Sequence, residues 1–200
     1  MQINDIQWWN EQFESGDWES GIDGKAQTRY FMELLLLHLP PEVSQDLAKA
    51  NTTILDWGCA LGQGVDVLTN AFAAAKVTGL DFAETACMKA KQLFPQYDFR
   101  SSPLGEGDFF DVIITSNVLE HYYDPFTLLK EHLKHAQKYY ILLVPYNQMP
   151  HDCHFYRFGK DSFPITMDNF IKYFVKVIPS TGNPLWNDQQ ILVVYKLIAQ

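Results

Sequence analysis

The feature that most constrains the fold of this chain is an alternation of short, continuous apolar runs with segments of helical periodicity. Strands are predicted at 53–55, 76–80, 97–100, 110–116, 139–144, 175–179 and 191–197, and helices at 62–75, 85–93, 125–136 and 167–174. Strands that are apolar along their length and alternate with helices are typical of a parallel sheet covered on both faces. The pattern therefore predicts an α/β fold with a mostly parallel sheet.

The end of the chain departs from this alternation. Its last two predicted strands are joined through residues 180–184, which carry no helical pattern. Neighbouring antiparallel strands need no crossover helix, so we expect an antiparallel last strand in a sheet of seven. A length of 200 residues fits one domain. We expect a single unit over 1–200, with a helical cap at 1–50 and a ligand-binding core at 51–200.

Charge and cysteine content narrow the classes of function. The 15 Lys and Arg against 24 Asp and Glu give a formal net charge of −9. This balance disfavours a nucleic acid as partner, because that affinity comes largely from clustered basic side chains. No apolar run approaches the roughly 20 residues of a membrane helix, so no membrane association is expected. Cys59, Cys87 and Cys153 are odd in number and widely spaced, which favours free thiols and a cytoplasmic location.

The strongest motif is the stretch 54–64 (ILDWGCALGQG), where small residues occupy the turn from a predicted strand into a predicted helix. Small residues let the backbone approach a ligand closely, and the N–H groups of a helix start hold an anion. Asp81 ends the next predicted strand, 81 − 62 = 19 positions after Gly62. An acid at that place accepts hydrogen bonds from ribose hydroxyls. Together these features predict an adenosine-type cofactor.

Spacing separates two classes of protein that bind such cofactors. Dinucleotide-binding folds carry G-x-G-x-x-G, and the nearest frame here, 62–67, has Val67 where the third small residue belongs. The stretch 56–62 instead resembles the D-x-G-x-G-x-G motif of class I S-adenosylmethionine (SAM)-dependent methyltransferases, with Ala60 replacing the middle glycine. Segments 79–83 (GLDFA) and 110–121 (FDVIITSNVLEH) resemble further motifs of the small-molecule branch of that family, which includes quinone-biosynthesis methyltransferases.

This resemblance implies a Rossmann-like fold, SAM as the cofactor and a set of cofactor contacts. It places Asp56 and Ala60 in the glycine motif, Gly58, Cys59 and Gly62 at the methionine moiety, Asp81 at the ribose, Phe82 and Ser102 at the adenine, Asn117 and Val118 at the pocket edge, and Arg29 at the carboxylate. The chain departs from the family pattern at two places. Ala60 adds a methyl group near the ligand, and Ser101 and Ser102 stand where many relatives have an acid.

The chemistry implied by the resemblance needs few protein groups. Methyl transfer from a sulfonium is an in-line displacement, which a protein assists by positioning the nucleophile and excluding water. An oxygen nucleophile usually also needs a base, and His121 and His154 are the candidates. His121 has a second interpretation, a hydrogen bond that fixes the loop 122–125. The stretch 151–154 (HDCH) has no second Cys/His pair at ligand spacing, so no metal is predicted.

Two segments stay open between a functional and a structural interpretation. The stretch 147–163 follows the fifth predicted strand, where relatives of the resembled family keep substrate-recognising insertions, but an ordinary surface loop also fits. The N-terminus, with Trp8, Trp9, Phe13 and Trp18, is either a lid over a substrate or a helix that caps the core.

From the motifs we predict SAM-dependent methyl transfer to a small-molecule acceptor, with S-adenosylhomocysteine as product. Residues 116–119 (SNVL) do not match the N-P-P-Y or D-P-P-Y that amino-group DNA and RNA methyltransferases carry there. Two alternatives remain: a SAM-binding module without catalysis, favoured by Ala60, and a nucleotide-dependent oxidoreductase, disfavoured by Val67. No motif indicates the oligomeric state.

Overall fold

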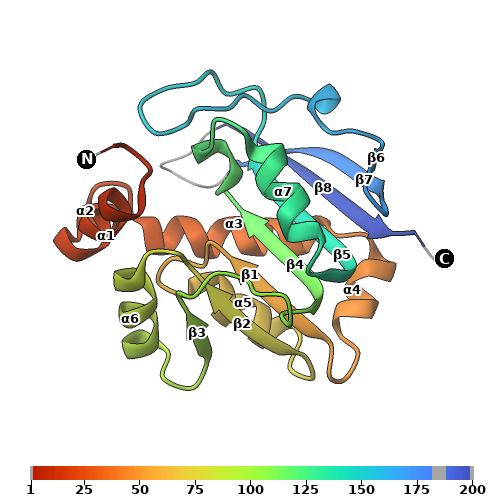
Figure 1. The fold of residues 1–200 in the computed structure, drawn as a ribbon, viewed down its shortest axis with the longest axis horizontal. Helices are drawn as coiled ribbons and strands as arrows, with labels where there is room; N and C mark the ends of the chain where they lie inside the picture. Colours follow the sequence, from red (N-terminus) through yellow and green to blue (C-terminus); the bar gives the residue numbers. More distant parts are fainter. Residues whose placement is uncertain (1, 182–187, 199–200) are drawn as a thin grey trace.

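The computed structural model describes residues 2–181 and 188–198, which form one eight-stranded sheet and its covering helices (Figure 1). The strands are β1 (Thr53–Trp57), β2 (Lys76–Leu80), β3 (Asp98–Arg100), β4 (Phe110–Ser116), β5 (Ala136–Pro145), β6 (Thr166–Met167), β7 (Phe170–Pro179) and β8 (Gln189–Leu197). The helices are α1 (Ile6–Ser15), α2 (Asp17–Ser20), α3 (Gly24–His38), α4 (Pro41–Leu47), α5 (Gln63–Ala71), α6 (Glu84–Leu93) and α7 (Pro125–Leu133), with 3₁₀ turns η1 (Leu119–His121) and η2 (Lys160–Ser162).

The strand order is β3-β2-β1-β4-β5-β8-β7-β6. The first five strands along the chain pair in parallel, and β8 runs antiparallel between β5 and β7. The Rossmann-like arrangement with an antiparallel last strand is confirmed, although the described residues form eight strands where seven were expected. The order changes direction at β1, so the turns after β1 and β4 lie side by side, which is the usual place for a ligand in such sheets.

The helix predicted at 167–174 is wrong, and it accounts for the additional strand. These residues form the end of β6, a turn and the first half of β7. Asp168 has a left-handed φ of 49°, which short polar side chains tolerate, and Phe170 then pairs with Leu197 of β8. The β-branched and aromatic residues of this stretch favour a strand, and pairing with β8 overrides their helical spacing.

Helices cover both faces of the sheet, as expected (Figure 1). Helices α3, α4 and α5 pack on one face, in a cluster that includes Leu35, Leu47 and Leu68 together with Ile54 of β1. Helix α7 covers the other face. The central part of β4 and residues 139–145 of β5 are buried, which explains the continuous apolar runs 112–114 and 139–145.

The helices of the segment predicted as a cap, 1–50, lie in two different parts of the structure. Helix α3 puts Phe31 and Leu35 into the same cluster as the central strands, so it is part of the core layers. Helix α1 packs through Phe13 on Ala60 and Ala86, beside the carboxyl ends of the strands. Figure 1 shows α1 and α2 at that end of the sheet. Within the described ranges, no helix has both the length and the apolar composition needed to cross a membrane.

The core role of α3 is tested by two leucines on its opposite sides. Leu35 is completely buried, whereas Leu37 is 76% exposed. We expect Leu35→Ala to lower the free energy of unfolding by about 3 kcal/mol, because a buried cavity replaces the side chain. Leu37→Ala is the matched control, with a change within about 0.5 kcal/mol. Urea denaturation measures both, and similar values for the two variants would contradict this placement of α3.

Candidate functional site

A cavity of about 510 Å³ lies at the carboxyl ends of β1, β2 and β4, beneath α1 and α2. Its size is in the range of small-molecule sites. Its lining joins the turns after those strands to the N-terminal helices and to the loop after β5. Of the residues predicted for the site, the lining contains Gly58, Ala60, Asp81, Phe82, Asn117, Val118, His121 and His154.

The turn after β1 has the shape that its small residues predict. Gly58 has φ 80° and its N–H donates to the Leu80 carbonyl at 2.7 Å. A Cβ on Gly58 would lie 2.5 Å from Val118 Cγ2, so a larger residue does not fit between these two loops. Gly62, with φ 88°, starts α5. Ala60 takes a left-handed φ of 45°, a conformation that costs more for alanine than for the glycine of the usual motif.

Asp81 ties the turns after β1 and β2 together. Its carboxylate accepts hydrogen bonds from Ala60 N at 3.0 Å and from Ala83 N at 2.9 Å. Burial raises the pKa of Asp81 to about 6, against the lowering effect of these two bonds. The group is therefore mainly a carboxylate at pH 7, and each oxygen keeps a further lone pair for a ligand hydroxyl.

Asp56, the first residue of the glycine motif, lies behind the turn and outside the cavity lining. It is 3% exposed, and its Oδ2 has no hydrogen-bond partner among the described residues. Burial is the main reason that the pKa of Asp56 is raised to about 7, and the neighbouring Asp81 charge adds to it. Asp56 is thus a buried carboxyl under the turn that holds the site.

The structure places four other predicted contacts away from the cavity. Cys59 is completely buried behind the turn, and a Cβ on Gly62 would meet the Phe99 ring. The Arg29 guanidinium donates to Asp66 at 2.6 Å, on the side where α3 meets α5. Ser102 is exposed beyond the end of β3.

His121 and His154 meet on one side of the cavity. His121 follows β4 within η1, and its ring lies edge-on to Trp9 and to His154, with centroid distances of 5.1 Å and 4.8 Å. The pKa of His121 is lowered to about 4 and that of His154 to about 3, mainly by burial. Both imidazoles are therefore neutral at pH 7. The His121 ring also makes a hydrogen bond, to Cys153 O at 2.9 Å, which joins it to the loop after β5 and not to the loop 122–125 named in the prediction.

Several residues of the site were missed from the sequence. Glu120 is 1% exposed, lines the cavity, and has two carboxyl oxygens without a partner among the described residues. Burial raises the pKa of Glu120 to about 8. Glu120 lies in the Leu-Glu-His part of the motif at 110–121, and this position in the sequence could have indicated it as a site residue. Asn4 donates to His121 O at 3.0 Å and to Cys153 O at 2.7 Å, and no local pattern indicated this role.

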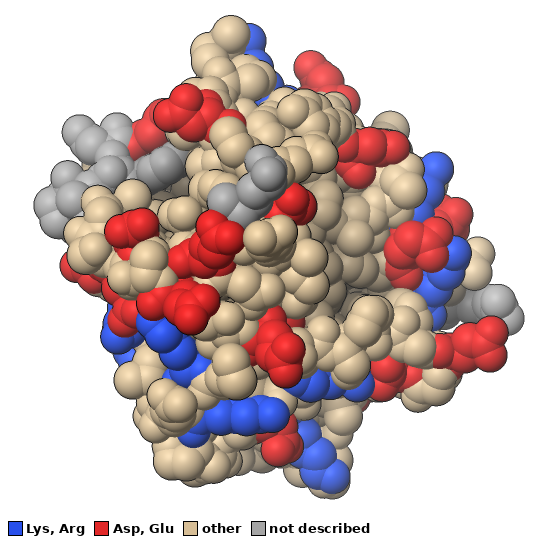
Figure 2. All heavy atoms as spheres, turned by 60° about the vertical axis from the view of Figure 1, so that its left-hand side comes forward, with Lys and Arg blue, Asp and Glu red and all other residues tan. Residues whose placement is uncertain are grey.

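The cavity has an aromatic wall and a negative charge balance. Its wall includes Trp8, Trp9 and Trp18 from the N-terminal helices. Among the described residues that line it, the carboxyl groups are those of Asp17, Asp81 and Glu120, and no Lys or Arg side chain is present. With a pKa of about 8, Glu120 is mainly neutral at pH 7, so Asp17 and Asp81 carry the negative charge. Figure 2 shows acidic side chains scattered over the face that carries these helices, with basic ones mainly lower down. The cavity therefore favours a cationic or neutral ligand over an anionic one.

Comparisons with known proteins agree on the nature of the domain. The family model described as "Methyltransferase domain" matches residues 55–138, which contain the turn after β1, Asp81 and His121. A search of curated proteins gives no match.

Solved structures share the fold at low sequence identity. A chain from the complex of the Haloferax volcanii Trm112 methyltransferase activator with a methyltransferase has a TM-score of 0.71 and 12% identity, over 96% of this chain and 98% of that one. The plantazolicin methyltransferase BpumL, in complex with SAH and a pentazolic desmethylPZN analog, gives 0.65 and 13%, over 97% and 96%. Magnesium protoporphyrin IX methyltransferase (ChlM) from Synechocystis, with bound SAH, gives 0.65 and 16%, over 98% and 89%.

The raised pKa of Asp56 predicts a pH-dependent stability. The folded chain keeps the Asp56 proton between about pH 4 and about pH 7, where the unfolded chain has released it. The stabilisation from this group is therefore complete below about pH 4 and is lost as the pH rises through about 7. Relative to Asp56→Asn, the wild type should lose up to about 1.4 kcal/mol of unfolding free energy per pH unit in that range.

Asp66→Asn is the control for this experiment. Hydrogen bonds from Arg29 and Tyr97 outweigh burial and lower the pKa of Asp66, so its charge stays constant between pH 5 and pH 8. Urea denaturation at both pH values should show a changing difference for Asp56→Asn and a constant one for Asp66→Asn. A constant difference for both variants would mean that Asp56 is ionised throughout.

Proposed function

We propose that this chain is a class I SAM-dependent methyltransferase and that it methylates a flat, largely apolar small molecule, which binds beneath the aromatic N-terminal helices. The observation that carries this proposal is the single cavity in which the glycine turn and Asp81 face the tryptophans and the two histidines. One end suits the cofactor and the other an acceptor, so a nucleophile on the acceptor lies within reach of the cofactor.

The cofactor end fits SAM on three observations. The space beside Gly58 would be filled by any Cβ, Asp81 offers lone pairs to ribose hydroxyls, and Phe82 lies next to it in the lining. SAM supplies a methyl group on a positively charged sulfonium, and the ionised side chains among the described lining residues, Asp17 and Asp81, are both acidic. The residues that hold SAM in this proposal are Gly58, Ala60, Asp81, Phe82, Asn117 and Val118, with Asp56, Cys59 and Gly62 shaping the turn from behind.

Arg29 and Ser102 have no direct contact with SAM in this arrangement. Arg29 supports α5 through its ion pair with Asp66, and α5 begins at the glycine turn. The N–H groups of Gly58, Cys59, Ala60 and Gly62 in the turn already donate to acceptors within the protein, so none of the four is assigned to the carboxylate of SAM.

The acceptor end is hydrophobic and closed by rings. Trp8, Trp9 and Trp18 lie on the N-terminal side of the cavity, and Phe31 and Tyr122 line it from the core side. Aromatic walls bind flat apolar groups well and exclude water, which protects an in-line displacement. This arrangement supports the lid interpretation of the N-terminus. The similarity to BpumL and ChlM, whose names give small-molecule substrates, supports a small-molecule acceptor.

His121 and His154 are proposed to contact the nucleophilic group of the acceptor. Their neutral rings provide nitrogen lone pairs, and their pKa values of about 4 and about 3 make them weak as bases near neutral pH. Their role is therefore to hold and orient the nucleophile.

We also propose a cytoplasmic location, supported by Cys59, Cys87 and Cys153, which are all free thiols.

Asp81 provides the first test of the cofactor site. Asp81→Ala should weaken SAM binding by about 1–3 kcal/mol, roughly 5- to 150-fold, because buried ribose hydroxyls lose their acceptor. Asp98→Ala, on the exposed side of the neighbouring strand β3, is the control and should bind SAM like the wild type. Calorimetric titration measures both, and unchanged affinity in Asp81→Ala would remove Asp81 from the site.

The acceptor end is tested through turnover. Incubation of the wild type with SAM and a panel of aromatic alcohols, thiols and amines should release S-adenosylhomocysteine with at least one acceptor. His121→Ala should then bind SAM within about threefold of the wild type but lower kcat by about 100-fold, because the nucleophile loses its orientation. SAM binding without turnover on any acceptor would favour a non-catalytic binding module. Equal kcat values would return His121 to a structural role.

A further inference from the structure

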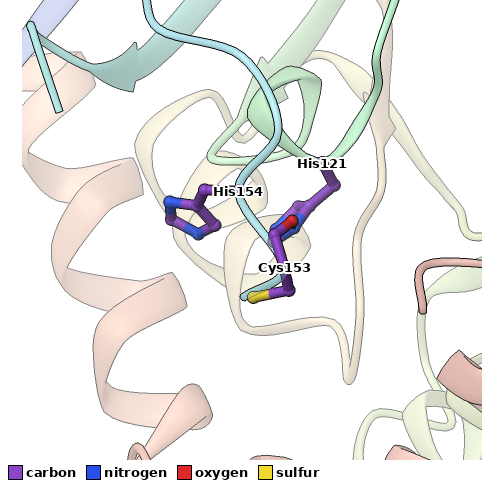
Figure 3. Close-up of side chains that lie close together, drawn as sticks. All are labelled: His121, Cys153 and His154. Carbon is purple, nitrogen blue, oxygen red and sulfur yellow. The ribbon is translucent and has the colours of Figure 1, made fainter. Parts of the chain in front are cut away.

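Three side chains with metal-binding atoms meet at the acceptor end of the cavity. They are His121, from the segment after β4, and Cys153 and His154, from the loop after β5. Their ligand atoms all lie within 4.8 Å of one another. Figure 3 shows the two rings and the thiol gathered around one place, although 32 residues separate His121 from Cys153.

The hydrogen bonds behind the rings prepare both histidines for a metal ion. His121 Nδ1–H donates to the Cys153 carbonyl at 2.9 Å, since a carbonyl only accepts. His154 Nδ1 lies 2.7 Å from Gln148 Oε1, and the Gln148 amide nitrogen faces His151 at 3.0 Å, which fixes the oxygen as the acceptor of the His154 proton. Both rings therefore carry their lone pair on Nε2. Metal-binding histidines almost always donate their other nitrogen to such outer acceptors.

The backbone that carries the three side chains is held by hydrogen bonds. His151 and His154 exchange two main-chain bonds, of 3.0 Å and 2.7 Å, across a tight turn. Phe155 N donates to Glu120 O at 2.7 Å, and this bond joins the loop to η1. Asn4 bridges the His121 and Cys153 carbonyls. The three ligands are thus positioned by the fold before any ion binds.

We propose that His121, Cys153 and His154 form a zinc-type metal site, whose fourth coordination position faces the cavity and takes a hydroxyl or thiol group of the acceptor. Two imidazoles and one thiolate match the ligand preference of Zn²⁺, and three protein ligands with one open position are the pattern of reactive zinc sites. Bonds of about 2.0 Å to nitrogen and about 2.3 Å to sulfur place tetrahedral ligands about 3.5 Å apart. The ligand atoms, which lie within 4.8 Å of one another, would therefore need to approach by up to about 1 Å when an ion binds.

The site refines the role given above to the two histidines. The metal-binding part stands on the three side chains alone, and only the role of the open position rests on the proposed methyl transfer. An acceptor O–H or S–H that binds there releases its proton to solvent and is held as an anion. The nucleophile is then activated without a basic histidine.

Metal titration of the untagged, EDTA-treated full chain tests the site. We expect one Zn²⁺ per chain by elemental analysis, and with Co²⁺ a tetrahedral visible spectrum that includes a thiolate charge-transfer band. His121→Ala and His154→Ala should each weaken Zn²⁺ binding at least about 100-fold, and Cys153→Ser should also remove the charge-transfer band. His38→Ala, on α3 and outside the cavity, is the matched control and should bind like the wild type.

Further measurements separate the metal site from misfolding and from the proposed function. Gln148→Ala keeps all three ligands and should weaken Zn²⁺ binding about 10- to 100-fold, since it removes only the outer acceptor. Circular dichroism and thermal denaturation of each metal-free variant verify that the chain is folded. Failure of the wild type to bind Zn²⁺ and Co²⁺, or equal binding by His38→Ala and the ligand variants, would overturn the metal site. Metal binding without SAM binding would uphold the metal site and contradict the proposed function.

Discussion

The cavity depends on one carboxylate. Asp81 accepts the N–H groups of Ala60 and Ala83, so the turn after β1 and the turn after β2 are fastened to a single side chain. Without it, the left-handed conformation of Ala60 would have little to hold it, because the backbone strain there needs compensation. The group that is expected to bind the ribose is therefore the group that builds the pocket wall. Structure and ligand recognition are coupled at this residue.

The two ends of the cavity differ in how they are built. The cofactor end consists of turns that leave the rigid central strands, and its polar side chains include Asn117 and the buried Asp81. The acceptor end consists of side chains from three separate segments: the N-terminal helices, η1 and the loop after β5. Asn4 joins all three by bonding to the carbonyls of His121 and Cys153. The chemistry at that end thus relies on long-range contacts.

This difference explains which parts of the site were predictable from the sequence. The cofactor end was predictable from local spacing, because Gly58, Ala60 and Asp81 follow directly on strands that their apolar runs predict. The partner of Arg29 was not, since Asp66 lies 37 residues away on another helix. The helix predicted at 167–174 failed for the same reason, because pairing with β8 decides the conformation of this segment. Likewise, no spacing rule links His121 to Cys153 and His154.

The loop after β5 positions Cys153 and His154 at the cavity although these residues lie in neither a helix nor a strand. Phe158 and Phe163 are 1% and 2% exposed and pack into the core beneath α7, and Phe158 O also accepts Asn147 N at 2.7 Å. The loop is therefore anchored at its start by Asn147 and at its end by Phe158 and Phe163. The part between Asn147 and Phe158 reaches the cavity with Cys153 and His154. Cys153 and His154 in that part line the acceptor end, whereas the glycine turn and Asp81 belong to other segments of the chain. A fixed cofactor end beside an exchangeable loop is the arrangement by which one scaffold serves different acceptors.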